Sequence, residues 1–407
     1  MEGNVKIQDL PPSRPQARKY RLAVVTSHPV QYQAPLFQKL ARHPQIDLMV
    51  YYKSDFSLRG ERDPGFGVPV KWDRPLLEGY RSKFLKNGTG MSSGGRGLGG
   101  FAIIPEFWHE RYSAVFIHSY ATLLSLMAYV GAWLSQTPVL LHTESELIRL
   151  RGPLVQAIKR LFLGVLFRGT AGFQAIGSPN RAFYRYYGVS EAQIYHTPYS
   201  VDNEFFTSEG AKWMAQREQL KVGLGFAPNM AVILFSGKLI PRKRPMDLLR
   251  AYAGLVEEGV AAGLLFIGEG ELRSVLEQFA RQRGLTNVKI AGFQNQTQLP
   301  RYYAVGDVFV LPSEFDPWGL VVNEAMLFSM PVIVSDRVGA GSDLVQDNET
   351  GYIYPVGDVT RLRALLKKLL INTDLRQRMG QAAQERIKHW NYDTCVTEIV
   401  RAVAAVA

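Results

Sequence analysis

Residues 232–255 read VILFSGKLIPRKRPMDLLRAYAGL: a continuous apolar run, a short basic turn and then an amphipathic stretch. An apolar run of this length is typical of a parallel strand that is covered on both faces. The apolar spacing from Pro245 to Leu255 predicts a helix. The stretch therefore predicts one strand–turn–helix unit, in which Lys238 and Lys243 lie at the carboxyl end of the strand.

The same alternation of short apolar runs and helical stretches extends through the chain in both directions. We expect strands at 22–25, 46–51, 114–117, 139–141 and 172–176, and again at 232–235, 263–267, 288–290, 308–311 and 332–334. Such alternation predicts parallel sheets in an α/β protein. A polar turn at 198–203 separates the two series. We therefore expect two Rossmann-like domains that face each other across a cleft, over residues 22–200 and 201–388.

Composition limits the possible partners without choosing one. The 407 residues are 46% hydrophobic and 20% charged, enough for two cores, and carry a net charge of +11. This charge attracts anions such as diphosphates, membrane surfaces or nucleic acid. The single cysteine, Cys395, excludes an internal disulfide and fits a reducing compartment. Residues 1–21, rich in proline and cations, predict a disordered basic arm and not a signal peptide, so we expect a cytoplasmic protein.

Two carboxylates, Asp316 and Glu324, lie eight positions apart, with Gly319 and the start of a helical pattern between them. Eight helical residues rise ~12 Å, too far for two carboxylates to share a proton. The spacing suits two contacts on one long polar ligand, while the helix N-terminus between them favours phosphate. A nucleotide sugar has this layout. The alternative is that Asp316 caps a helix and Glu324 is a solvated helical residue.

The spacing resembles the E-x7-E motif of glycosyltransferase family 4, with Asp316 in the first Glu position. Lys238 and Lys243 resemble the two cations of the family's G-R-L-x-x-x-K, although Lys238 replaces the usual Arg with a point charge. The resemblance covers about 22–390. It implies the GT-B architecture, a C-terminal helix in 389–407 that joins the first domain, and retaining, metal-independent transfer of a sugar from a nucleotide sugar to an acceptor hydroxyl. Polysaccharide, lipopolysaccharide or glycolipid assembly is the expected setting.

The resemblance also implies roles for residues of the second domain. Asp316 holds hydroxyls of the donor sugar and Glu324 holds the ribose. The diphosphate is expected to meet Lys238, Lys243 and the amides of Gly319, Leu320 and Val321, while Gly268 permits close backbone approach and Phe293 meets the base. The sequence has no D-x-D motif, so we expect no metal, and no cofactor other than the nucleotide sugar itself.

The first domain offers the catalytic candidate. His142 follows a predicted buried strand, as a family histidine does near the reacting centre, and a histidine can donate or accept at neutral pH without a full buried charge. His118 ends the preceding strand in a similar way. After the first strand, His28, Gln31 and Tyr32 stand where many relatives have a Gly-Gly loop, so we expect them to contact the acceptor. Ordinary loop histidines are the alternative.

The acceptor is expected to be a carbohydrate or lipid-linked molecule, and no nucleic acid is expected. Residues 147–168 mix cations with large apolar side chains, a pattern that fits peripheral contact with an anionic membrane or, alternatively, a core helix with solvated cations. Two other functions stay open: a nucleotide-sugar 2-epimerase of the same architecture, and a non-catalytic nucleotide-sugar-binding subunit.

Overall fold

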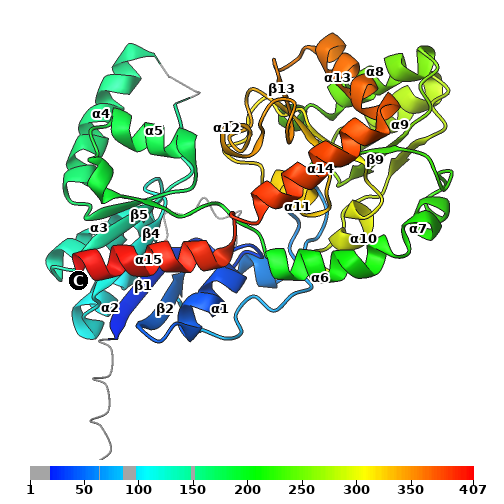
Figure 1. Cartoon of the computed structure of the whole chain (residues 1–407). Helices are drawn as coiled ribbons and strands as arrows, with labels where there is room; N and C mark the ends of the chain where they lie inside the picture. The colour runs from blue at the N-terminus through cyan, green and yellow to red at the C-terminus, as the bar shows by residue number, and fades with distance from the viewer. Residues whose placement is uncertain (1–18, 64, 86–97, 148–151) are drawn as a thin grey trace, which may run out of the picture.

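The computed structural model describes residues 19–63, 65–85, 98–147 and 152–407. They form two lobes, each built on one parallel sheet with helices on both faces (Figure 1). This confirms the predicted α/β architecture of two Rossmann-like domains. The predicted basic arm at 1–21 is too long, because Tyr20 and Arg21 already pair with Ile46 and Asp47 in the first sheet. The rest of the predicted arm, 1–18, lies outside the described residues.

Within the described residues, the first sheet has seven parallel strands in the order β3-β2-β1-β4-β5-β6-β7. The strands are β1 (Tyr20–Thr26), β2 (Ile46–Tyr52), β3 (Arg81–Phe84), β4 (Ala114–His118), β5 (Val139–His142), β6 (Gly172–Ala175) and β7 (Ile194–His196). The helices are α1 (Ala34–Arg42), α2 (Ile103–Glu110), α3 (Leu123–Leu134), α4 (Pro153–Arg168) and α5 (Ser178–Tyr186). The central strands are buried on both faces, as continuous apolar runs predict.

The second sheet has six parallel strands in the order β10-β9-β8-β11-β12-β13. The strands are β8 (Val232–Ser236), β9 (Gly263–Ile267), β10 (Val288–Ile290), β11 (Val308–Leu311), β12 (Val332–Ser335) and β13 (Gly351–Tyr354). The helices are α6 (Asn203–Met214), α7 (Arg217–Gly223), α8 (Pro245–Glu257), α9 (Arg273–Gln282), α10 (Leu299–Tyr303), α11 (Leu320–Leu327), α12 (Gly341–Leu344), α13 (Val359–Ile371) and α14 (Thr373–Ile387). Residues 232–255, predicted as one strand–turn–helix unit, form β8, the turn after it and most of α8.

The last helix, α15 (Tyr392–Val406), leaves the second lobe and lies along the first (Figure 1). Ile399, Val400 and Val403 share the core beneath the first sheet with Phe116 and Leu140. This apolar stripe has helical spacing, so burying it against the first sheet stabilises the return of the chain. No helix in the described ranges combines the length and the apolar character that crossing a membrane requires.

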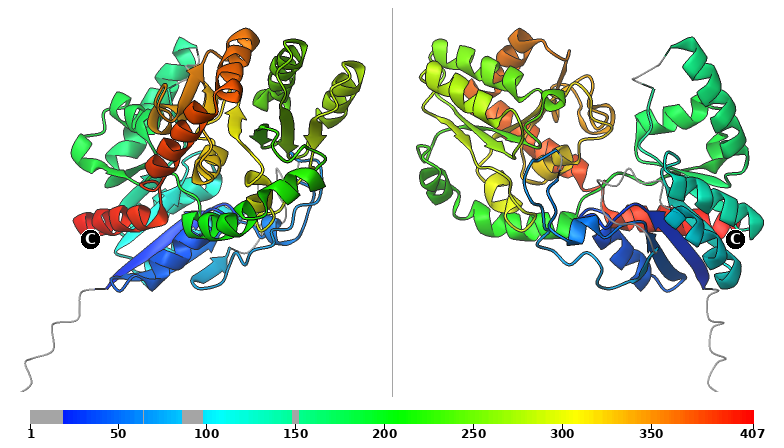
Figure 2. Two further views of the ribbon diagram at one scale, coloured as in Figure 1. Left: turned by 45° about the vertical axis from the view of Figure 1, so that its right-hand side comes forward. Right: turned by 180° about the vertical axis from the view of Figure 1, so that it is seen from behind.

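In both sheets the strand order reverses at one point, between β1 and β4 in the first and between β8 and β11 in the second. Open parallel sheets bind ligands beyond the carboxyl ends of their strands at such a reversal, because the loops on either side diverge there. We therefore expect a ligand site at the residues that follow β1 and β4 and at those that follow β8 and β11. Both sets lie toward the space between the lobes (Figure 2).

Candidate active site

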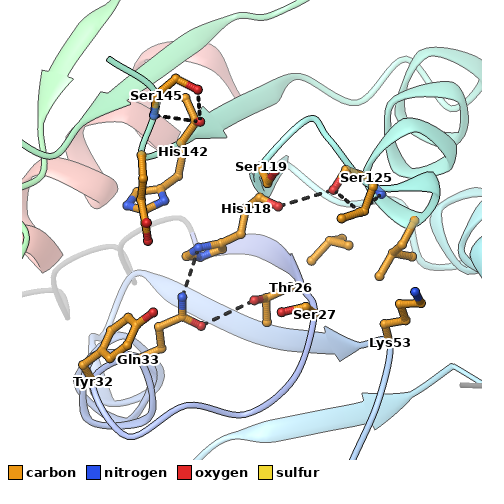
Figure 3. A pocket seen from close by; sticks show the side chains of 15 residues that line it. Thr26, Ser27, Tyr32, Gln33, Lys53, His118, Ser119, Ser125, His142 and Ser145 are labelled. Carbon is orange, nitrogen blue, oxygen red and sulfur yellow. Dashed lines mark hydrogen bonds between the residues drawn. The ribbon is translucent and has the colours of Figure 1, made fainter. Parts of the chain in front are cut away.

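A pocket of about 420 Å³ lies at the reversal point of the first sheet (Figure 3). Thr26 and Ser27 come from the end of β1, and His118 and His142 come from the ends of β4 and β5. The structure thus brings together three of the sequence candidates, His142, His118 and Tyr32. Gln33, and not the predicted Gln31, completes this wall. His28 lies outside the lining, where its Nδ1 is 2.9 Å from the Ser27 hydroxyl.

His118 and His142 are register partners on adjacent strands, which places their ring centres 4.6 Å apart. Gln33 donates its amide to Nδ1 of His118 at 3.3 Å, while its oxygen accepts from Thr26. The proton of neutral His118 therefore lies on Nε2, which has no hydrogen-bond partner among the described residues. Burial lowers the pKa of His142 to about 4 and that of His118 well below its usual value. Both imidazoles are neutral at pH 7.

The depressed pKa of His142 makes stability depend on pH. Between about pH 6.5 and 4 the unfolded chain binds a proton at His142 that the folded protein does not, so stability falls as the pH falls through this window. His142→Gln removes this contribution. We expect the stability of the native protein relative to the variant to drop by roughly 2 kcal/mol between pH 6.5 and pH 5, measured by urea unfolding. Parallel pH profiles for the two proteins would contradict it.

Glu144, which the sequence analysis did not single out, lies between the pocket and the second domain. The hydroxyl of Tyr199 donates to its carboxylate. The Glu144 side chain is accessible to water at the cleft, but protein atoms lie on most sides of its carboxyl group. Burial, with the negative charge of Asp316 across the cleft, raises its pKa. No spacing signal marked Glu144, because the residues that give it a role, Tyr199 and Asp316, are distant in the sequence.

In the second domain, Asp316 and Lys243 form an ion pair, with side chains only 11% and 13% exposed. The loop that carries Lys243 is attached to the loop that carries Asp316, since Arg242 donates to the carbonyl of Phe315 at 2.7 Å and accepts from the amide of Glu314 at 2.8 Å. Asp316 therefore orients the ammonium group of Lys243. The sequence had assigned these residues to different parts of one ligand, and the structure places them in direct contact.

Helix α11 begins directly after this pair. Gly319 is its N-cap, and Leu320 and Val321 form its first turn, where amides have no acceptor within the helix. Glu324 lies one turn further on and accepts a hydrogen bond of 2.6 Å from the Tyr303 hydroxyl. Burial raises the pKa of Glu324 to about 7. The arrangement pairs an amide cluster with a carboxyl group on one short helix.

Two predicted donor residues contact the first domain. Lys238 binds the carboxylate of Asp63 at 2.7 Å, and the ring of Phe293 packs edge-on against Phe66 with centres 5.0 Å apart. Gly268 has a backbone role in the structure. A Cβ there would lie 1.9 Å from the carbonyl oxygen of Gly237, so glycine is required where the ends of β8 and β9 meet.

Comparison with known proteins identifies the second domain. Residues 216–386 match the family model described as glycosyl transferases group 1. Residues 216–386 form a glycosyl transferase group 1 domain. The matched residues include Lys238, Lys243, Asp316 and Glu324. The match to the family model agrees with the resemblance to glycosyltransferase family 4.

The chain is 30% identical over 202 residues to a sulfoquinovosyl transferase of Arabidopsis thaliana, covering 49% of this chain and 37% of the relative. It is 26% identical over 217 residues to a GDP-mannose-dependent phosphatidylinositol monomannoside mannosyltransferase of Mycobacterium tuberculosis, covering 51% and 55%. The matches therefore span about half or less of these relatives. The crystal structure of Anabaena HepE in complex with UDP and glucose superposes with a TM-score of 0.71 at 16% identity. The match covers 95% of this chain and 100% of HepE, so the two proteins share the fold of both lobes.

Proposed function

We propose that the protein transfers a sugar from a nucleotide-sugar donor to an acceptor hydroxyl, with retention at the anomeric carbon and without a metal ion. The observation that carries the proposal is that the points of strand-order reversal in the two sheets face each other. The first sheet presents a pocket that contains Glu144 and the neutral imidazole of His142. The second presents the ion pair of Lys243 and Asp316, directly before the amides of α11. The group 1 match and a neighbour solved with UDP support a donor of this class.

The charges fit this reaction. When the bond between the anomeric carbon and the diphosphate breaks, negative charge grows on the departing phosphate oxygen. Lys243 and the amides of Leu320 and Val321 would stabilise that charge, the largest electrostatic demand of the step. The acceptor oxygen bonds to the same face of the anomeric carbon, and its proton passes to the departing phosphate or to Glu144. His142, neutral at pH 7, would hold sugar hydroxyls by hydrogen bonding and not by charge.

A donor panel tests the proposal. The purified protein is incubated with UDP-, GDP- and ADP-sugars, with and without sugar or lipid-linked acceptors, in the presence of a metal chelator. Transfer requires an acceptor, and NMR of the product reports its anomeric configuration. Isomerisation of a donor without acceptor would support a 2-epimerase instead. Binding without either reaction would indicate a non-catalytic subunit, and inversion or loss of activity with chelator would contradict the proposed mechanism.

Helix α4 supports an amphipathic, lipid-linked acceptor. Its exposed side chains include an unusual number of large apolar ones: Leu154, Val155, Ile158, Leu161, Phe162 and Val165. Exposed Arg160 and Arg168 lie on the same helix. A groove of about 670 Å³ runs from Glu144 beside the pocket to Ile158 and Phe162. Apolar chains of a lipid-linked acceptor would fit this groove while α4 rests on an anionic membrane surface. The mannosyltransferase relative is named for a phosphatidylinositol substrate, which agrees with this acceptor class.

Vesicle binding checks the role of α4. Ile158→Glu should lower partitioning onto phosphatidylglycerol vesicles about tenfold, because it replaces a 62% exposed apolar side chain with an anion. Ile371→Glu, at a 68% exposed isoleucine of α13 in the other lobe, is the matched control and should leave binding unchanged. Co-sedimentation at low and high salt measures both. Absence of binding by the native protein, or equal losses in the two variants, would remove the membrane from the proposal.

A further inference from the structure

The chain between β2 and β3 leaves the first lobe and lies against the second (Figure 2, right). We name its described residues 61–63 and 65–74 the strap. The strap is held to itself as a narrow hairpin: Arg62 bridges Pro69, the amide of Asp63 donates to Val68, and the amide of Val70 donates to Glu61. The hairpin makes the strap a defined structural element that reaches across the cleft.

The tip of the strap engages the first cation of the donor site. Asp63 accepts hydrogen bonds from Nζ of Lys238 at 2.7 Å and from the amides of Gly65 and Phe66 at 2.8 and 2.9 Å. Nζ of Lys238 also lies 4.7 Å from the centre of the Phe66 ring. Burial alone would raise the pKa of Asp63, but Lys238 and these amides lower it, so the carboxylate is charged.

The fit is close at the backbone as well. A Cβ added to Gly65 would lie 2.5 Å from Nζ of Lys238. A side chain at position 65 would therefore require the flexible end of Lys238 to move away from the strap. A carboxylate and an aromatic ring thus converge on one ammonium group, and these are the kinds of group that the diphosphate and the base of a nucleotide would offer.

A second group of contacts fastens the base of the strap to the loop that follows β10. Asn295 donates to the carbonyl of Lys71 at 2.6 Å and accepts from the amide of Asp73, while Asp73 accepts from the amide of Thr297 at 3.1 Å. The ring of Trp72 lies 6.1 Å from that of Phe293. These contacts hold the tip near Lys238 at high effective concentration.

We propose that Asp63 is an intramolecular substitute for the donor diphosphate on Lys238, so that the strap tip and the donor compete for this lysine while the strap base stays attached. The inference rests on the proposed function, because it requires Lys238 to bind the donor. Donor binding then exchanges one anion for another at the same ammonium group. The competition weakens donor binding. Lys238 leaves Asp63 only when a diphosphate takes the place of this carboxylate.

Calorimetric titration with UDP, GDP and ADP tests the competition. Asp63→Asn should lower the Kd of the nucleotide that binds by about threefold to tenfold, a modest gain because the pair is partly exposed. Asp73→Ala, which removes contacts at the strap base, should also lower the Kd. Lys238→Ala should raise the Kd, and the Asp63→Asn/Lys238→Ala double variant should match Lys238→Ala alone. Glu61→Gln, an equal charge change on the same strap without contact to Lys238, should leave the Kd unchanged.

The possible outcomes distinguish a failure of the competition from a failure of the proposed function. An unchanged or raised Kd in Asp63→Asn, with nucleotide still bound, would overturn the competition and leave the proposed function intact. The same gain in Glu61→Gln would attribute the effect to general charge, and would also overturn it. If no protein in the series binds any nucleoside diphosphate, both the competition and the proposed function fail. Thermal unfolding of each variant confirms that the compared proteins are folded.

Discussion

Lys243→Ala is expected to lower kcat about a hundredfold to a thousandfold, the effect of removing one charge-stabilising group from a water-poor site. The same change leaves Asp316 buried without its cation, since both side chains are almost fully covered. We therefore also expect a loss of about 3 kcal/mol in unfolding free energy. Steady-state kinetics with the donor and acceptor from the panel, together with urea unfolding, measure the two effects.

A double variant separates catalysis from stability. Lys243→Met with Asp316→Asn removes both charges, so the buried site is no longer left with an unpaired ion. Stability should return to within about 1 kcal/mol of the native protein, while kcat stays at least a hundredfold down. Recovery of activity along with stability would show that Lys243 has only a structural role.

Glu324→Gln is expected to change binding and stability in opposite directions. Loss of a charged acceptor for the ribose hydroxyls should raise the Kd of the nucleoside diphosphate roughly tenfold to a hundredfold. The folded protein, in contrast, should gain about 1–2 kcal/mol at pH 8, because burial raises the pKa of Glu324 to about 7 and so disfavours the charged form there. Glutamine keeps an acceptor for the Tyr303 hydroxyl.

The pH dependence supplies the control for Glu324. A raised carboxyl pKa means that the folded protein binds more protons than the unfolded chain between about pH 4.5 and 7, so this group costs stability above that window. The stability gain of Glu324→Gln should therefore disappear at pH 5. A gain of equal size at both pH values would contradict the assignment, as would unchanged nucleotide affinity, which would remove Glu324 from the donor site.

The interior strands of both sheets and the edge strand β10 could be predicted from the sequence, whereas the edge strands β3 and β13 could not. The predicted strands at 263–267, 288–290 and 308–311 match β9, β10 and β11 residue for residue. The edge strand β3, RSKF, was not predicted, because alternate side chains face water and the run lacks a continuous apolar signal. β13 was also missed. It is another short strand, and it lies at the edge of the second sheet beside β12.

The candidate site also has some residues that the sequence predicted and others that it did not. The sequence predicted His142, Lys243 and Asp316 as site residues, because each lies at or after the carboxyl end of a buried strand and parallel strands bind ligands at that end. It did not identify Glu144, nor did it indicate that Lys243 and Asp316 contact each other. It also assigned the contact at Lys238 to a ligand alone, whereas Asp63 of the first domain occupies that position.

What the sequence determined by itself is the pair of parallel sheets, the polar turn between them and the residue types at the strand ends. These follow from local periodicity, since burial on both faces demands continuous apolar runs. Only the tertiary structure decided which strand ends meet: His118 beside His142, Tyr199 on Glu144, and the strap on Lys238. Such contacts join residues far apart in the chain, and their energies depend on burial and distance, which no local pattern encodes.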